Sequence, residues 1–104
     1  MKHLLLASAL TLLPASAAPA GDLIRNACLN ADRPGASRQL CSCIQKVADQ
    51  SLKRRDQKLA ASFFSDPHKA QVIRQSDRPA NEVFWARYKE FGNTAEQVCA
   101  DIAG

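Results

Sequence analysis

Apolar residues recur along most of the chain every three or four positions, the spacing of amphipathic helices, and no stretch alternates as a strand would. The first stripe consists of Ile24, Ala27, Cys28 and Ala31. The second consists of Leu40, Ile44, Val47, Ala48 and Ser51. The pattern predicts an all-α protein, a small bundle of five or six short helices.

Turn and capping residues divide this pattern into segments. We expect turns at residues 32–35 and 76–79, because each contains a proline that a helix interior excludes. Asp22 and Ser37 stand where side chains cap the first two helices. At 66–67, Asp66 is expected to cap another short helix whose first residue is Pro67.

Further boundaries follow from individual residues. No glycine or proline stands directly after Leu52. The pattern therefore allows either two helices or one bent helix that continues past this point. Asn81 is expected to cap an aromatic-rich helix that ends at Gly92, where a glycine can adopt the left-handed conformation. Thr94, with Gln97 three residues later, matches a capping box and predicts a separate last helix.

The first twenty residues have the organisation of a secretory signal peptide. Lys2-His3 precedes an apolar run from Leu4 to Leu13, and the small residues Ala18-Pro19-Ala20 follow. We expect cleavage at Ala20/Gly21, with Ala15-Ser16-Ala17 as a second recognition sequence. An uncleaved anchor is the alternative, but the run covers about ten residues whereas a bilayer span needs about 20. The expected mature chain is a single helical domain, residues 21–104, periplasmic or secreted and without a membrane span.

The expected mature chain carries a small positive charge. All ten acidic residues and thirteen of the fourteen basic residues lie after position 20, which gives a net charge of +3. This charge does not indicate nucleic-acid binding. The densest basic run is Lys53-Arg54-Arg55 together with Lys58. It is either a solvated helix start or a contact patch for an anionic partner or for lipid headgroups.

The cysteines Cys28, Cys41, Cys43 and Cys99 indicate two disulfides, because an even number in a short exported chain is typical of a disulfide framework. On a helix, positions 41 and 43 are rotated by about 200° and do not readily bond to each other. In a hairpin of the first two helices, Cys28 lies nearer Cys41 than Cys43. This favours Cys28–Cys41 with Cys43–Cys99 and leaves Cys28–Cys43 with Cys41–Cys99 as the alternative. Zinc, soft copper or redox exchange are the other uses of these residues.

No pattern of residues indicates catalysis. His68 is the only histidine after the first twenty residues, and no partner for a metal site or a catalytic triad is signalled around it. The sequence has no phosphate-binding loop, zinc motif or nucleophile elbow. We therefore expect a protein that is not an enzyme and holds neither a cofactor nor a metal.

The aromatic residues form a second candidate surface. Phe84, Tyr88 and Phe91 share one helical face, and Trp85 lies at its margin. We expect this face to be hydrophobic core. Alternatively, Trp85 and Tyr88 line a groove that meets a ligand or partner. The possible binding surface thus consists of the basic run and these two side chains.

The stretches Cys41–Gln45, Phe63–Ala70, Val72–Asp77 and Phe84–Tyr88 resemble those of a group of small exported alphaproteobacterial proteins with four cysteines. Members of this group are often labelled automatically as arginine transporters. A transporter must span the membrane, so the resemblance implies at most an accessory protein or small binder of a basic ligand such as arginine. Our leading hypothesis is an interaction module for an envelope protein, and a thiol redox or metal-handling protein is a further alternative.

Overall fold

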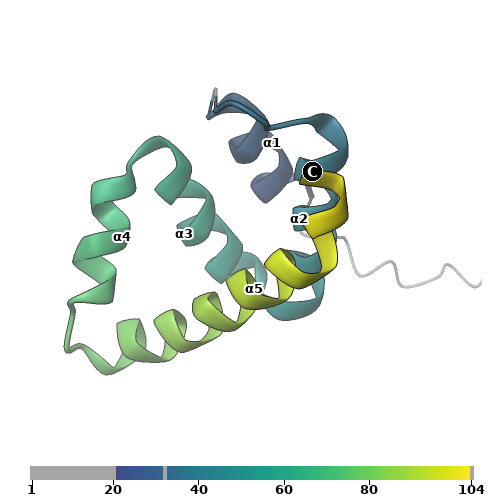
Figure 1. The fold of residues 1–104 in the computed structure, drawn as a ribbon. Helices are drawn as coiled ribbons and strands as arrows, with labels where there is room; N and C mark the ends of the chain where they lie inside the picture. Colours follow the sequence, from purple (N-terminus) through teal and green to yellow (C-terminus); the bar gives the residue numbers. More distant parts are fainter. Residues whose placement is uncertain (1–20, 32, 104) are drawn as a thin grey trace, which may run out of the picture.

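The computed structural model describes residues 21–31 and 33–103, and these form five α-helices without a strand (Figure 1). The helices are α1 (Leu23–Asn30), α2 (Arg38–Ser51), α3 (Arg54–Ser65), α4 (Pro67–Arg74) and α5 (Pro79–Ala103). The prediction of an all-α bundle is confirmed. The expected signal peptide, residues 1–20, lies outside the described residues.

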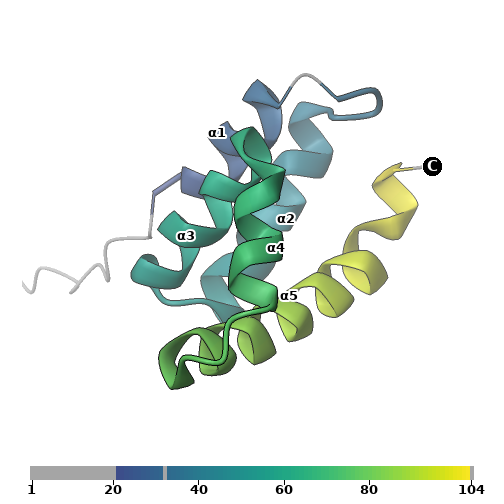
Figure 2. The same ribbon diagram turned by 90° about the vertical axis from the view of Figure 1, so that its left-hand side faces the viewer.

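The longest helix, α5, runs along one side of the molecule beneath the others (Figure 2). It packs against α2, α3 and α4, whereas α1 packs against α2 and α3. The short helix α4 lies at the edge, and none of its residues is buried. Helices α3, α4 and α5 therefore form one end of the bundle, and α1 and α2 with the last turns of α5 form the other (Figure 1).

A single hydrophobic core connects both ends. Its buried members come from α1, α2, α3, α5 and the α2–α3 link: Ile24, Val47, Ala48, Leu52, Ala60, Phe63, Phe84, Phe91 and Cys99. Partly buried residues pack around them, including Leu40, Ile44, Leu59, Ala70 and Ile73. The helical spacing predicted that seven of these positions turn inward: Ile24, Leu40, Ile44, Val47, Ala48, Phe84 and Phe91.

The N-terminus of α1 is capped by Gln45 of α2 rather than by Asp22, so the predicted local cap is wrong. The Gln45 side chain is 5% exposed. Its Oε1 accepts hydrogen bonds from the backbone N–H groups of Ile24 at 2.8 Å and Arg25 at 2.9 Å. Asp22 makes no capping bond and pairs with the Arg25 guanidinium at 3.3 Å. A glutamine from a neighbouring helix thus satisfies N–H groups that would be costly to leave unpaired.

The same glutamine belongs to a polar network that accompanies the break between α2 and α3. Gln45 Nε2 donates to Asp49 at 2.8 Å and to Gln57 at 2.9 Å. Gln57 Nε2 donates in turn to Asp49 and to the carbonyl of Leu52, each at 3.2 Å. Leu52 and Lys53 are extended, so α2 and α3 are two helices. Burial of Leu52 in the core and the bond to its carbonyl hold this turn without glycine or proline.

Of the caps predicted at Ser37, Asp66 and Asn81, the structure has one and lacks two. The Ser37 hydroxyl accepts from the backbone N–H three residues later at 3.0 Å, which confirms this cap. Asp66 precedes the first-position proline of α4 but makes no side-chain cap. Helix α5 begins at Pro79, and the Asn81 side chain donates to Ser76 Oγ at 2.9 Å. Asp66 and Asn81 therefore lie at helix starts without capping them as predicted.

The predicted break at Gly92 is wrong, because α5 continues through it to Ala103. Among the described glycines, only Gly21 and Gly35 have positive φ, so Gly92 does not end a helix. The predicted capping box at Thr94 consequently lies inside the helix. Phe91 and Cys99 are buried on either side of this point, and their burial outweighs the roughly 1 kcal/mol that a mid-helix glycine costs.

Replacing Gly92 by alanine is expected to raise the free energy of unfolding by about 0.5–1 kcal/mol, because the backbone is helical and a Cβ there meets nothing within 4 Å. Chemical denaturation of the two proteins measures this difference. Gly35→Ala is the matched control: its Cβ also meets nothing within 4 Å, but φ is +87°. This control is expected to lower stability. A loss of stability in Gly92→Ala would contradict the account.

Candidate binding surfaces

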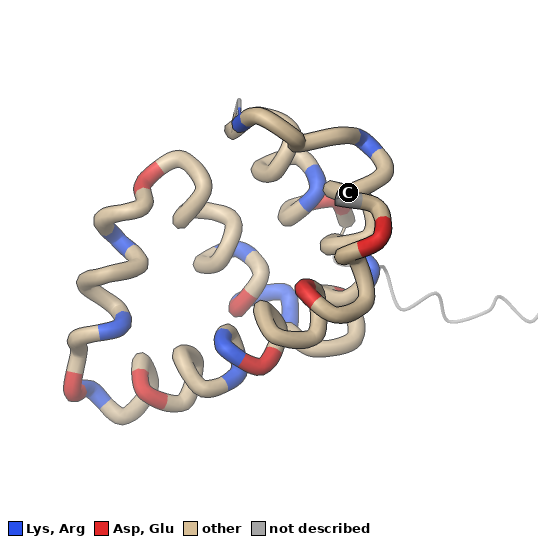
Figure 3. Tube along the Cα trace, viewed as in Figure 1, with Lys and Arg blue, Asp and Glu red and all other residues tan. Residues whose placement is uncertain are grey.

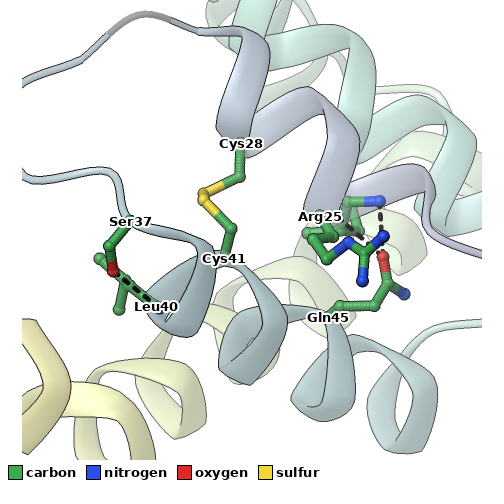
Figure 4. Close-up of a disulfide and its surroundings, with 7 residues drawn as sticks. Arg25, Cys28, Ser37, Leu40, Cys41 and Gln45 are labelled. Carbon is green, nitrogen blue, oxygen red and sulfur yellow. Dashed lines mark hydrogen bonds between the residues drawn. A yellow bond between two sulfur atoms is a disulfide. The ribbon is translucent and has the colours of Figure 1, made fainter.

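All four cysteines are paired as Cys28–Cys41 and Cys43–Cys99, which confirms the favoured pairing. The first bond ties α1 to α2, and both of its cysteines are buried (Figure 4). The second ties α2 to the last turns of α5, with Cys99 buried and Cys43 half-buried. In this state no sulfur is a thiolate, so none is available as a metal ligand. Within the described residues, no cluster of histidines, cysteines or carboxylates could hold a metal ion.

The basic run lies at the start of α3, where Lys53, Arg54, Arg55 and Lys58 are all exposed. Along the chain the run is bounded by Asp49 before it and by Asp66 after it, and residues of both signs occur elsewhere in the described part (Figure 3). Asp56 interrupts the run and points the other way, because it is only 5% exposed. The run is therefore a local feature of the first turns of α3 and not part of an extended basic face.

The aromatic residues form a packed cluster at the α3–α4–α5 end of the bundle. Tyr88 is its centre, with ring centroids 5.2 Å from Phe63, 5.7 Å from Phe84, 5.1 Å from Trp85 and 6.0 Å from Phe91. Trp85 and Tyr88 are half-buried and pack against the core. This supports the interpretation of these residues as core.

Burial raises the pKa of the Tyr88 phenol above its ordinary value of 10, and the nearby Arg33 charge opposes this only in part. Because the neutral form is favoured in the folded state, its contribution to stability is present below pH 10 and is lost as pH rises through the raised pKa. Tyr88 is the only tyrosine in the chain, so the absorbance of tyrosinate reports its titration. We expect a higher midpoint for folded than for urea-unfolded protein. A folded midpoint at or below the unfolded one would contradict this.

A groove of about 440 Å³ lies between the first turns of α3 and of α5. Its apolar lining includes Leu59, Pro79, Ala80, Val83 and Phe84. Two guanidinium groups border it, Arg55 from α3 and Arg87 from α5. The groove thus joins one residue of the basic run to the aromatic-rich helix, which the sequence presented as two separate surfaces. We call it the α3/α5 groove.

An ion pair crosses this groove and was not predicted from the sequence. The Arg87 guanidinium donates from Nε to Asp56 Oδ2 at 2.8 Å and from Nη2 to Oδ1 at 3.0 Å. These hydrogen bonds raise the pKa of Arg87 further above its ordinary value, so the side chain stays charged. The available signal was the position of Asp56, four residues before the core residue Ala60. A carboxylate on an inward face needs a charged partner.

Two other pockets differ in chemistry. The pocket between α2 and α5, about 430 Å³, is lined by Leu40, Ile44, Gly92, Ala95, Cys99, Ala100 and the single charged residue Glu96. The pocket at the start of α1, about 350 Å³, contains both signs of charge: Asp22, Arg25, Lys46 and Asp49. The first is almost entirely aliphatic, whereas the second is polar. Of these three pockets, the α3/α5 groove combines an apolar floor with two guanidinium groups.

These features define a small all-α protein stapled by two disulfides. No protein-family model matches the chain, and no curated protein or solved structure is significantly similar to it. In residues 21–31 and 33–103, no helix has the length and apolar content that a bilayer span requires. Disulfides persist in oxidising compartments, so the two bonds fit a location outside the cytoplasm.

Proposed function

We propose that this chain is an exported, non-enzymatic interaction module of the periplasm, which binds another envelope protein through the α3/α5 groove. The observation that carries this proposal is the groove itself: an open apolar floor bordered by Arg55 and Arg87. Exposed apolar area next to charged groups is typical of a protein-binding site.

The bonds made by the cysteines and by the buried polar side chains support a binding role over catalysis. The four sulfurs are bonded to one another, and both oxygens of Asp56 are occupied by Arg87. Gln45 and Gln57 are bonded to backbone and to each other inside the bundle. His68 is exposed in the first turn of α4. The cysteines, Asp56, Gln45 and Gln57 thus all make bonds that stabilise the fold.

Site-directed photo-crosslinking in cells of the source organism tests the proposal. A photoreactive amino acid at position 83, in the groove, is compared with one at position 72, on α4. Val83 and Val72 are 54% and 53% exposed, so the two probes are equally accessible. We expect a discrete adduct with one envelope protein from position 83 in the periplasmic fraction and none from position 72. No adduct from either position, or the same adducts from both, would count against the proposal.

A second candidate function is a small binder for a basic amino acid such as arginine. The pocket at the start of α1 favours it, because Asp49 could receive a guanidinium and Lys46 a carboxylate; Asp22 and Arg25, which pair with each other, also line this pocket. Calorimetric titration with arginine tests this, with the uncharged analogue citrulline as the control. Binding heat with arginine but not with citrulline, and no binding heat when arginine is titrated into Asp49→Asn, would support this function. No heat at millimolar ligand would remove it.

A further inference from the structure

We infer that the α3/α5 groove selects an acidic peptide segment that carries an apolar anchor residue. This inference rests on the proposed function, because it names the chemistry of the partner that the groove would take. It follows from three properties of the groove: its apolar floor, its uncompensated positive charge and the remaining hydrogen-bonding capacity of Arg87.

The floor of the groove is suited to an apolar side chain. Phe84 at its base is 4% exposed, while Val83 at its edge is 54% exposed. Leu59 of α3 and the residues Pro79 and Ala80 of α5 complete the apolar lining. An anchor residue placed here would remove the Val83 side chain from water, and burial of apolar area is the main source of affinity at such a site.

The charges that line the groove do not cancel. Arg87 neutralises Asp56, because its guanidinium contacts both carboxylate oxygens. Arg55 is left as an exposed cation, because Asp56 is the one acidic residue of the lining and both of its oxygens contact Arg87. Exposed Arg54 and Lys58 extend the positive potential along α3. An acidic segment is therefore attracted, whereas a basic segment is repelled.

Arg87 can contact a ligand without releasing Asp56. Its guanidinium has five N–H groups, and the ion pair uses one from Nε and one from Nη2. The side chain is 39% exposed, so the remaining donors are reachable from the groove. Asp56 fixes the orientation of the guanidinium, which reduces the entropy lost when a carboxylate binds.

A peptide fits these observations better than a free anion or a lipid surface. A phosphate ion would use the guanidinium groups but would leave the apolar floor in water. A membrane surface would need basic residues spread over one face, and here the basic run is confined to the first turns of α3, between Asp49 and Asp66 along the chain (Figure 3). A peptide with glutamate beside leucine provides both the charge and the anchor.

Fluorescence anisotropy with labelled peptides tests the inference on the disulfide-bonded chain. The probe is a peptide of alternating glutamate and leucine, and the controls replace glutamate by lysine or leucine by serine. We expect the glutamate–leucine peptide to bind about tenfold or more tightly than either control. Unlabelled phosphate and vesicles of phosphatidylglycerol serve as competitors. Stronger binding of the lysine peptide, or full competition by the vesicles, would overturn the inference.

Two pairs of matched variants locate the binding site. Arg55→Glu and Arg54→Glu make the same charge change in adjacent exposed residues, but only Arg55 lines the groove. Val83→Asp and Val72→Asp change equally exposed valines, and only Val83 lines the groove. We expect Arg55→Glu and Val83→Asp to weaken peptide binding about tenfold, with much smaller losses in their controls. Equal losses within each pair would overturn the assignment to the groove.

The two levels of the proposal can fail separately. A crosslinked partner from position 83, without preference for the glutamate–leucine peptide, would overturn the acidic chemistry and leave the interaction module intact. Peptide selectivity that survives Val83→Asp and Arg55→Glu would overturn the groove. Far-UV circular dichroism confirms that each variant is folded; all four changed side chains are exposed, so their folding is expected to be preserved.

Discussion

Reduction of both disulfides is expected to unfold the chain or to leave it loosely packed at ordinary temperature. Cys28–Cys41 closes a loop of sequence separation 13, and Cys43–Cys99 closes one of separation 56. In the chain-entropy account these bonds contribute about 3 and about 4 kcal/mol. Small domains have total stabilities of about 5–15 kcal/mol, so the two bonds together are comparable with the whole.

Thermal melts followed by circular dichroism, with and without reductant, measure this effect. Paired serine variants separate the two bonds: Cys28→Ser with Cys41→Ser, and Cys43→Ser with Cys99→Ser. We expect the second pair to cost more, because its loop is longer and because it releases the last turns of α5, where Val98 and Ile102 are already exposed. A reduced chain that melts at the same temperature as the oxidised one would contradict the account.

Replacing Gln45 by alanine is expected to lower the free energy of unfolding by about 3 kcal/mol. The substitution leaves the N–H groups of Ile24 and Arg25 and the side-chain oxygen of Gln57 without their partners. Ile24 is fully buried, so water cannot replace the lost hydrogen bond without opening α1. Such unpaired buried groups cost more than the loss of the side chain alone.

Urea denaturation measures the effect of Gln45→Ala, and Gln39→Ala on the same helix is the control. Gln39 is exposed, and its replacement is expected to change stability by less than about 0.5 kcal/mol. Hydrogen exchange adds a local measure: the amides of α1 should lose protection first, while Cys28–Cys41 keeps the helix near α2. Equal stability of the two variants would show that the glutamine does not cap α1.

Local pattern predicted α1 and α2 because the buried face of each of these helices repeats within the segment itself. The stripes from Ile24 and from Leu40 identify α1 and α2, and Ser37 marks the start of α2 correctly. Helix geometry also disfavoured a bond between Cys41 and Cys43, because these positions point in nearly opposite directions on a helix. Hairpin register then favoured the pairing that the structure has.

What the sequence did not predict depends on contacts between distant residues. The cap of α1 comes from Gln45, and the partner of Asp56 is Arg87, thirty-one positions later. Gly92 was assigned to a helix end by local preference alone. Buried Phe91 before it and the disulfide-bonded, buried Cys99 after it keep α5 continuous. Tertiary packing commonly overrides a local preference of this size.

The candidate site was predicted only in part. The basic run identified Arg55, and the aromatic helix identified the segment that supplies Phe84. The two aromatic residues chosen from the sequence, Trp85 and Tyr88, turn instead toward the core cluster. Which side of α5 meets α3 depends on how the helices pack, and a helical stripe does not determine this.

Peptide mapping of the protein isolated from its native cells, without reduction, shows whether Cys28–Cys41 joins α1 to α2 and Cys43–Cys99 joins α2 to α5. The protein is alkylated before any reductant is added, digested without reduction and analysed by mass spectrometry. We expect no alkylated cysteine and two linked peptide pairs with this connectivity. Four alkylated cysteines, or peptides that link Cys28 to Cys43, would contradict it.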